Sequence, residues 1–590
     1  MTDTATDSQT DNPTRVKCAS NSMRAGAGVV PGAGDVTSAS AAGGPRASTP
    51  ARSASLPPSP SPVQVLRIEY WSHFLPLVVD KDRADSIISD IVEGVSIGRP
   101  PAQGVIESRN WPSALEFREK VSEVIQGDLD ADKLYGPFSS PPFPRYIVSP
   151  LGAFLKRDRS KIRLIHDLSF PKVGSVNSEI DPEQFSLEYS SVDEAVRACR
   201  SHSFPFMSKI DLKDAYKAIG IRVADWHLMG FKWSLDGGPD SYFFSKVLSF
   251  GLRSAPALFD RFAEILVLFM QFQGVQGNII RYVDDFLLVS KSRAEADSQL
   301  AAMISVARQA GFCIQESKIT PPSRCVEFLG VIIDLDSSEL RISQERIDEV
   351  RGLLAQWGGS RVVSKRRILK LVGKLAFAAR VVRTGRAFLG RLIGLSKSAS
   401  ALHHRVRISQ AARRDLEWWR DCLASHNGTC ILEVDWSHGD IRHIFTDASN
   451  YGFGCVMDEE WIAIAYQGGN SFPGGFSINW RELHAAVKAL ATWGPSLRGS
   501  KVLFHIDNST TCHVLNKLYS PVSELMELIR AWCILIERFS ITVAVVYIPT
   551  DENVLADALS RGDLDGFFRS LGGRGRRVWP ESFLYFDSLV

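Results

Sequence analysis

The chain has 590 residues, of which 45% are hydrophobic, 10% aromatic and 23% charged. This globular composition excludes collagen-like, wholly disordered and disulfide-scaffold proteins, and the length predicts roughly three to five domains. The net charge is only +2, but residues 361–420 hold sixteen Lys or Arg against two acids, which gives 16 − 2 = +14 for that block and 2 − 14 = −12 for the rest. Such a block is typical of proteins that bind phosphate backbones, and a solvated helical face is the alternative.

Cysteine usage and hydropathy bear on the compartment. The nine cysteines include no CxxC pair, which argues against zinc sites and disulfide frameworks and favours a reducing compartment. No apolar run reaches the roughly 18 to 20 residues that span a bilayer, and the first residues lack the pattern of a secretory signal. We therefore expect an intracellular protein, in the cytoplasm or the nucleus, that has no membrane partner.

The first third of the chain divides into three parts. Residues 1–63 are rich in Ser, Thr, Gly, Ala and Pro, and this low complexity predicts a disordered tail. Residues 64–140 show apolar spacings of three and four, which predict a mainly helical extension, and we find no chemistry in it. Residues 144–170 read as two strands joined by a polar turn, with Lys156 and Arg163 on the two arms.

A first group of acids follows. An apolar strand ends at Asp211 and leads into a predicted helix, while NIIRYVDDFLLVS places Asp284 and Asp285 at the tip of a short β-hairpin. Paired acids at a tight turn repel each other unless a cation lies between them. Mg²⁺ is the natural candidate because it favours carboxylate oxygens and keeps positions for phosphates. For the two acids of the hairpin alone, an ordinary solvated turn is the alternative.

Four motifs in one order make residues 141–340 resemble the fingers and palm of a reverse transcriptase: D-L-x-x-A-Y at 211–216, F-G-L-x-x-A-P at 250–256, YVDD at 282–285 and F-L-G at 328–330. The resemblance implies two Mg²⁺ ions, with Mn²⁺ as an alternative, that activate the primer 3′-hydroxyl and neutralise the leaving pyrophosphate. The ligands that it implies are the carboxylates of Asp211, Asp284 and Asp285 and the backbone carbonyl of Leu212.

The same resemblance implies a site for the incoming dNTP. Lys156 and Arg163 match residues that grip the triphosphate, as suits a substrate with several negative charges. Tyr216 matches the aromatic that excludes a 2′-hydroxyl, and a core tyrosine is its alternative; Lys318 matches a lysine proposed to protonate pyrophosphate, and an exposed lysine is equally consistent. Phe250 precedes Gly251 of the same site, where the retroviral pattern has glutamine, which favours a non-retroviral retroelement.

A second group of acids lies between residues 441 and 561. The sequence predicts that they lie on a strand, in the first turn of an amphipathic helix, at the end of a buried strand and on a further helix; they are Asp447, Glu482, Asp507 and Asp557. Each alone has an ordinary explanation as a turn, cap or surface residue.

Together with the N-x-x-A-D-A-L-S-R ending at 553–561, the four acids make residues 436–565 resemble a ribonuclease H domain. The resemblance implies two Mg²⁺ ions and a water activated against an RNA phosphodiester. One departure is Tyr547, where related retroelements usually have His.

The basic segment between the two groups, residues 341–435, is predicted to be helical and resembles a thumb and connection. In that setting it would carry template and primer from one site to the other. We expect its cations to contact nucleic-acid backbones without reading bases, so that affinity falls with salt. The candidates are Lys374, Arg380, Arg383 and Arg386.

The sequence thus predicts a multidomain α+β protein in which a right-hand polymerase (fingers, palm and thumb) precedes a ribonuclease H-like α/β domain and a C-terminal tail at 566–590. Its expected partners are an RNA template, a DNA primer, an RNA/DNA hybrid and dNTPs; a dimer is left open. The motifs most resemble DIRS or gypsy-like retrotransposons, and the lack of D-[ST]-G and HHCC patterns slightly favours DIRS. A domesticated, catalytically inactive nucleic-acid-binding protein and an RNA-templated RNA polymerase are the alternatives.

Overall fold

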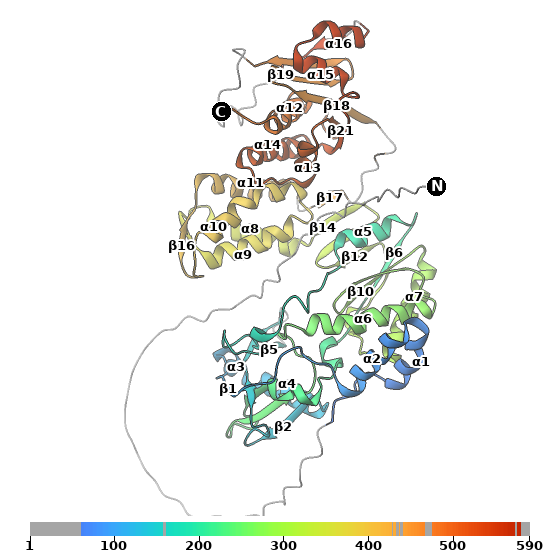
Figure 1. The fold of residues 1–590 in the computed structure, drawn as a ribbon, viewed down its shortest axis with the longest axis vertical. Helices are drawn as coiled ribbons and strands as arrows, with labels where there is room; N and C mark the ends of the chain where they lie inside the picture. Colours follow the sequence, from blue (N-terminus) through green and yellow to red (C-terminus); the bar gives the residue numbers. More distant parts are fainter. Residues whose placement is uncertain are drawn as a thin grey trace, which may run out of the picture. The chain divides into compact units, whose positions relative to one another are not determined.

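The computed structural model describes residues 61–156, 161–426, 429–431, 436, 440–466, 475–572 and 575–579. Most of the predicted N-terminal tail and the predicted turn at 158–160 lie outside these residues. Within them, no helix combines the length and the apolar character needed to cross a membrane. The arrangement of the elements can be followed in Figure 1.

The N-terminal extension is mainly helical, as predicted. Its helices are α1 (Ile68–Val78), α2 (Lys81–Glu93), α3 (Pro112–Glu116) and α4 (Arg118–Asp130). Trp71 of α1 is fully buried and makes edge-on ring contacts with Phe262 and Phe269 of α6 (Ala255–Phe272). The structure adds two short strands, β1 (Val105–Glu107) and β2 (Leu134–Phe138).

The first arm of the predicted hairpin at 144–170 is interrupted. Instead of one strand there are β3 (Tyr146–Val148) and β4 (Leu151–Leu155), separated at Pro150, which has no N–H to donate to a ladder. β3 joins the sheet β1-β3-β7-β8-β2 with β7 (Gly230–Trp233) and β8 (Ser241–Ser245), while β4 pairs with β5 (Ile162–His166).

A four-stranded sheet carries the first group of acids. Its order is β11-β6-β10-β9, with β6 (Phe206–Asp211) and β10 (Asp285–Ser290) antiparallel at the centre, β9 (Asn278–Tyr282) at one edge and β11 (Thr320–Ser323) at the other. Both α6 and α7 (Arg293–Gln309) contribute buried apolar side chains to the core that this sheet shares. The helix predicted after Asp211 is wrong: Asp214 adopts φ 51°, and only a 3₁₀ turn forms over Ala215–Ala218.

The basic segment is largely helical, as predicted. It begins after the hairpin strands β12 (Cys325–Phe328), β13 (Val331–Asp334) and β14 (Glu339–Ile342). Two short strands, β15 (Val362–Ser364) and β16 (Arg405–Arg407), pair with each other, and β17 (Thr429–Ile431) pairs with β14. The helices are α8 (Gln344–Trp357), α9 (Lys365–Ala378), α10 (Gly390–Lys397) and α11 (Gln410–His426).

The last part of the chain forms a six-stranded mixed sheet with the order β22-β21-β18-β19-β20-β23. β18 is parallel to β21, and β21 is parallel to β22. β19 runs antiparallel to both of its neighbours, β18 and β20. The strands are β18 (Ile441–Ala448), β19 (Gly452–Met457), β20 (Glu460–Ala465), β21 (Lys501–Ile506), β22 (Thr542–Tyr547) and β23 (Arg576–Arg577).

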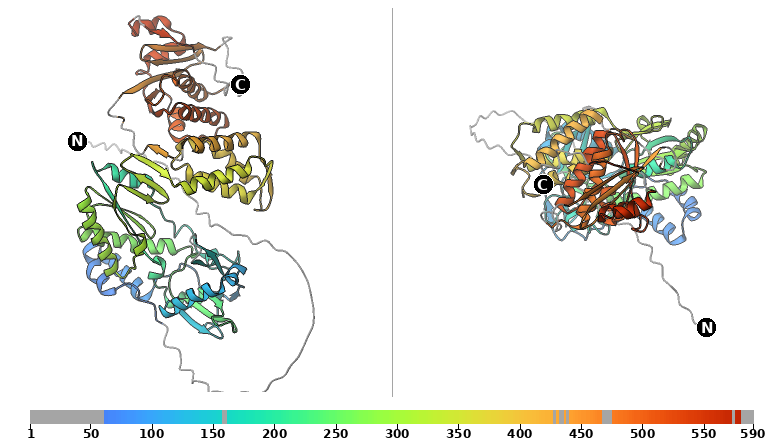
Figure 2. Two further views of the ribbon diagram at one scale, coloured as in Figure 1. Left: turned by 180° about the vertical axis from the view of Figure 1, so that it is seen from behind. Right: turned by 90° about the horizontal axis from the view of Figure 1, so that it is seen from above.

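Helices cover both faces of this sheet (Figure 2). On one face, α12 (Ile478–Trp493) and α14 (Ser523–Phe539) pack against buried residues such as Phe504 and Ile444. On the other face, α15 (Val554–Arg561) and α16 (Leu564–Ser570) bury Leu559 and Phe567 against Val456. The shorter α13 (Ser509–Lys517) follows β21. Because α16 and β23 belong to this unit, ordered structure continues beyond residue 565.

Two candidate carboxylate sites

The register of β6 and β10 brings the first group of acids together. Asp285 is the direct cross-strand partner of Asp211, and on its other side it is the partner of Tyr282 in β9. The backbone N–H of Leu212 donates to the carbonyl oxygen of Asp284 at 2.9 Å. The prediction that the paired acids lie at a hairpin tip is therefore confirmed, and Asp211 lies beside them.

Two lysines partly neutralise the negative charge of this group of acids. Lys318 Nζ lies 2.7 Å from Asp211 Oδ2, and Lys209 Nζ lies 3.8 Å from Asp285 Oδ1. Burial raises the pKa of Asp285 to about 6, with Lys209 opposing the rise and Asp211 adding to it. The pKa of Asp284 is also raised, again mainly by burial.

The donor set of this site suits a hard cation. Asp285 Oδ1 is buried and accepts no hydrogen bond, and a buried oxygen of this kind is costly unless something positive binds it. Three carboxylates at the meeting point of two strands are the oxygen ligands that Mg²⁺ or Mn²⁺ prefers. The residues present therefore fit a divalent metal.

The predicted sugar-contact residues form an aromatic group next to the acids. Tyr216 is buried, with its ring centroid 4.9 Å from that of Phe250 and 5.7 Å from that of Phe259. The pKa of Tyr216 is raised by burial and by nearby groups that include Asp284. Its packing against Phe250 and Phe259 fits the core alternative, and its contact with the sugar stays a prediction.

Gly251 is sterically required where it lies. Its φ is +106°, and a Cβ atom there would come within 2.7 Å of the carbonyl oxygen of His166. Any other residue would therefore strain the turn and push on β5. Phe250 keeps 41% of its surface exposed beside this close approach, so part of its ring is open to solvent.

Of the two cations predicted on the β4–β5 hairpin, Arg163 is connected to the acids. It is exposed, pairs across the ladder with Phe154, and its charge lowers the pKa of Asp284 against the effect of burial. Lys156 is also exposed, and its backbone N–H donates to Lys161 at 2.8 Å. The charge of Arg163 on this hairpin therefore acts on Asp284.

The second group of acids is more compact. Asp447 lies on β18, Asp507 directly follows β21, and Glu482 lies on α12; each offers an oxygen, and these oxygens all lie within 4.8 Å of one another. Among the residues that the structure describes, no other group of three such side chains is as close. The prediction that Glu482 lies in the first turn of its helix is wrong: it is the fifth residue of α12, 4% exposed, and faces the sheet rather than the helix start.

Burial and mutual repulsion make these acids hard to ionise. They raise the pKa of Glu482 to about 9 and that of Asp447 to about 6. Glu482 Oε2 and Asp507 Oδ1 are both buried without a hydrogen-bond partner. Buried carboxyl oxygens that lack hydrogen-bond partners and lie this close together ionise readily only when a cation binds between them, so this group fits a divalent metal as well.

Asp557 lies outside the tight group but close to it. Its charge raises the pKa of Asp447, while its own Oδ1 lies 2.7 Å from Nε of Arg561, one turn further along α15. It is half-buried. The structure thus gathers three of the four predicted acids and keeps the fourth at the edge.

The predicted nucleic-acid contacts differ among themselves. Lys374 is half-buried and its Nζ lies 2.5 Å from Glu349 Oε2. Arg380, Arg383 and Arg386 are exposed where α9 ends and the following 3₁₀ turn begins. Arg380 and Arg386 therefore present their charge to solvent, whereas Lys374 and Arg383 lie near acids, the latter with Nη2 3.9 Å from Asp193 Oδ1.

Sequence reasoning missed three features. Lys209 lies two residues before Asp211 on β6, so strand alternation places both on one face, and this signal could have found it. Thr550 donates to Asp507 Oδ2 across 43 residues, a contact that no local pattern predicts.

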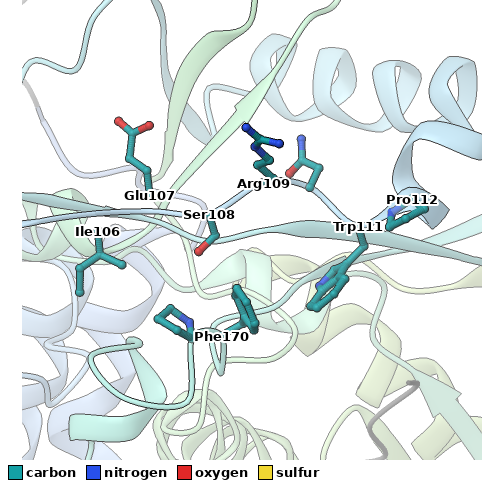
Figure 3. A pocket seen from close by; sticks show the side chains of 9 residues that line it. Ile106, Glu107, Ser108, Arg109, Trp111, Pro112 and Phe170 are labelled. Carbon is teal, nitrogen blue, oxygen red and sulfur yellow. The ribbon is translucent and has the colours of Figure 1, made fainter. Parts of the chain in front are cut away.

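The third feature is a cavity of about 510 Å³ in the N-terminal extension (Figure 3). Its lining includes Trp111 and Phe170, whose rings are 5.2 Å apart, and it contains none of the predicted site residues. No local pattern in the extension predicts this cavity, because β1 and the turn around Phe170 come together only through the tertiary fold.

Comparison with known families assigns the segment that holds the first site. Residues 156–333 match the family model described as reverse transcriptase (RNA-dependent DNA polymerase). These residues, which run from the β4–β5 hairpin to β13 and contain Asp211 and the YVDD hairpin, form a reverse transcriptase domain.

The chain is also similar to the Transposon Tf2-3 and Tf2-4 polyproteins of Schizosaccharomyces pombe (strain 972 / ATCC 24843). Each is 23% identical over 363 residues, which is 60% of this chain and 25% of the relative. The chain thus spans about a quarter of the length of these curated relatives. The DIRS subgroup stays a prediction.

Solved structures with similar folds include two of the foamy viral protease-reverse transcriptase. One, a form designated dRH in complex with double-stranded DNA, has a TM-score of 0.45 and 17% identity, and the match covers 84% of each chain. The other, in complex with an RNA/DNA hybrid, has a TM-score of 0.41 and 14% identity, and covers 86% of this chain and 88% of that one.

Proposed function

We propose that this chain is the RNA-directed DNA polymerase of a retrotransposon, also able to copy DNA, and that it carries ribonuclease H activity on RNA/DNA hybrids. The observation that carries the proposal is the antiparallel register that sets Asp285 opposite Asp211 inside the reverse transcriptase domain. The compact group of Asp447, Glu482 and Asp507 supports the second activity.

For polymerisation, Asp211, Asp284 and Asp285 would hold two Mg²⁺ ions, with the Leu212 carbonyl as a further ligand. The ions supply Lewis acidity toward the primer 3′-hydroxyl and the leaving pyrophosphate. The remaining work falls to side chains. Arg163 binds triphosphate oxygens, because a guanidinium matches two oxygens of a phosphate at once.

Two further residues act on the sugar and the leaving group. The ring of Tyr216, backed by Phe250 and Phe259, forms a firm wall under the sugar, which excludes a 2′-hydroxyl. Lys318, the ion-pair partner of Asp211, is placed to give a proton to pyrophosphate. Gly251 lets the backbone pass close to β5 and so keeps Phe250 in place.

For hydrolysis, Asp447, Glu482, Asp507 and Asp557 would hold the ions that supply an activated water. The sheet supports this role, because three antiparallel strands followed by two parallel ones bring the ends of β18 and β21 side by side. Asp447 is buried, and Asp507 is half-buried with one buried oxygen that has no hydrogen-bond partner, so the negative charge of these acids is poorly compensated without a cation.

Arg380, Arg383 and Arg386 would hold the sugar-phosphate backbone of the template and primer. They are exposed, and they belong to a block that carries a local charge of +14. Contacts of this kind neutralise phosphates without reading sequence. We expect the partners to be RNA template, DNA primer and their hybrid.

The second candidate is a catalytically inactive nucleic-acid-binding protein. The buried acids argue against it, because carboxylates with raised pKa values destabilise the fold when they ionise. A purely structural protein gains nothing from them, and replacement by amides or apolar residues would remove that cost.

The test is extension of a primed homopolymer RNA with Mg²⁺, run beside cleavage of a labelled RNA/DNA hybrid by the same preparation. We expect extension with dNTPs, far less with rNTPs, and cleavage of the RNA strand only. Preferred use of rNTPs would favour an RNA-templated RNA polymerase. Binding to the primed template with neither reaction would support the inactive alternative.

A further inference from the structure

One loop touches both strands that carry the acids of the second site. It runs from Ile548 to Asn553 and connects β22 to α15. At its start, the N–H of Ile548 donates to the carbonyl oxygen of Ile506 at 3.0 Å, and at its end Asn553 Nδ2 donates to the carbonyl oxygen of Thr446 at 3.0 Å. These two carbonyls belong to the residues directly before Asp507 and Asp447, so the loop fixes the backbone beside both.

The middle of the loop reaches the carboxylate of Asp507 itself. Thr550 Oγ1 donates to Asp507 Oδ2 at 2.9 Å. The other oxygen of Asp507, Oδ1, is buried and has no hydrogen-bond partner. One oxygen of this ligand is therefore held by a hydroxyl, and the other is left for something that the protein does not supply.

Without that hydroxyl, repulsion from the neighbouring acids would favour rotation of the Asp507 carboxylate away from them. Its carboxylate lies near Asp447 and Glu482, and like charges in a buried group repel one another. The terminal torsion of an aspartate is broad, so the carboxylate rotates easily unless it is held. The Thr550 hydroxyl opposes this rotation, because the carboxylate can turn only by losing the hydrogen bond.

We propose that Thr550 is a positioning residue that holds Asp507 in the orientation required to bind the divalent cation of the nuclease site. The inference rests on the proposed ribonuclease H function. Outer partners of this kind orient the ligands of a metal, and their loss costs roughly 10- to 100-fold in metal affinity. Thr550 lies on an exposed loop, so its role does not depend on packing in a core.

The experiment compares Thr550→Val, which keeps the shape and removes the hydroxyl, with Thr550→Ser, which keeps the hydroxyl. Mn²⁺ binding is measured by calorimetry on the full chain in an Asp285→Asn background, which weakens the polymerase site equally in every sample. In parallel, hybrid cleavage is measured across a range of Mg²⁺ concentrations. Thr542→Val, at the other end of β22, serves as the matched control.

We expect Thr550→Val to weaken Mn²⁺ binding at the nuclease site by about 10-fold and to raise the half-saturating Mg²⁺ concentration by a similar factor. High Mg²⁺ should restore most of the cleavage. Thr550→Ser and Thr542→Val should behave like the wild type. Primer extension, measured without the Asp285→Asn change, should be the same in all of them.

Three results would overturn the inference, and they differ in whether the proposed ribonuclease H function fails as well. If Asp507→Asn abolishes cleavage but Thr550→Val binds Mn²⁺ as the wild type does, only the role of Thr550 is wrong. If Asp507→Asn cleaves the hybrid at the wild-type rate, the nuclease assignment itself fails and the role of Thr550 fails with it. A loss of affinity that Thr550→Ser does not rescue would also contradict the proposed hydroxyl contact.

Discussion

The two carboxylate sites solve the same electrostatic problem in different ways. In the first, Lys318 and Lys209 lie beside the acids, at 2.7 Å from Asp211 and 3.8 Å from Asp285. In the second, among the residues that the structure describes, no ion pair involves Asp447, Glu482 or Asp507, although their oxygens lie within 4.8 Å of one another. Lysines thus supply part of the positive charge in one site and none in the other.

The difference appears in the pKa values. The pKa of Asp285 is raised to about 6, whereas that of Glu482 is raised to about 9, with burial as the largest cause in both. A site that contains its own cations tolerates the absence of metal, and one that lacks them depends on metal for its ionised state. The second site should therefore be the more sensitive of the two to metal removal.

The largest expected effect is that of Glu482→Gln. The amide keeps the shape of the side chain but cannot carry the negative charge that binds a cation, so hybrid cleavage should fall by at least about 100-fold. Primer extension should continue at the wild-type rate. The matched control is Glu524→Gln on an exposed turn of α14, which should leave both activities intact. If the Glu482 variant kept its cleavage activity, Glu482 would not be a residue of the cation site.

The pH dependence of metal-free stability sharpens the same comparison. Because burial raises the pKa of Glu482 to about 9 and that of Asp447 to about 6, the unfolded chain releases these protons at lower pH than the folded chain does. The contribution of these two acids to stability should therefore fall as the pH rises from about 4 to about 9 and should change little below about 4.

Thermal unfolding in EDTA across this pH range measures that effect. Mg²⁺ should oppose the loss, because it binds the ionised acids of the folded state. Glu482→Gln should flatten the curve above about pH 6, because Glu482 is the acid of this site whose pKa is raised to about 9. A metal-free wild type whose stability falls no more steeply with pH than that of Glu482→Gln would contradict the unbalanced charge of the site.

A smaller effect is expected from Lys209→Met in the polymerase site. Removing this cation takes away the charge that opposes the raised pKa of Asp285, so the acidic limb of the primer-extension profile should move to higher pH. Lys209→Arg should keep the limb near its wild-type position. The pH profile of hybrid cleavage should be unchanged in both variants, and a joint shift would mean that the two sites are not independent.

The smallest effect should come from the exposed arginines. Replacing Arg380 and Arg386 by Gln removes two cations from the proposed backbone contacts. The slope of log affinity against log salt for a primed template should then decrease by about 1 to 2. Lys374→Gln should change the slope less, since Glu349 already engages that lysine. Equal slopes in all variants would mean that the nucleic acid binds elsewhere on the protein and not at these arginines.

Much of the two carboxylate sites could be predicted from the sequence, because several of their acids lie at the ends of strands. Asp211 ends an apolar strand, Asp284 and Asp285 mark a hairpin tip, and Asp507 follows a buried strand; the structure places each of them there. Strand ends are readable because a run of apolar residues stops abruptly at a charge. The order of the four motifs along residues 141–340 then gave the resemblance to a reverse transcriptase.

The errors share a different cause. The helix expected after Asp211 is only a 3₁₀ turn, because Asp214 adopts a left-handed conformation that no local pattern required. Glu482 was predicted to lie in the first turn of its helix, but it lies further along α12, where tertiary packing buries it close to Asp447 of β18. Thr550 acts on an acid of another segment, so its role exists only in the tertiary structure, whereas the spacing of Lys209 and Asp211 on one strand could have been read from the sequence.

The most direct measurement is a reciprocal separation of activities in one folded protein. Asp285→Asn and Asp507→Asn are purified in parallel, matched by thermal unfolding in Mg²⁺, and assayed for extension of a primed RNA and for hybrid cleavage. The account predicts that Asp285→Asn loses extension and keeps cleavage, and that Asp507→Asn does the reverse. Loss of both activities in either well-folded variant, or of neither, would contradict two separate carboxylate sites.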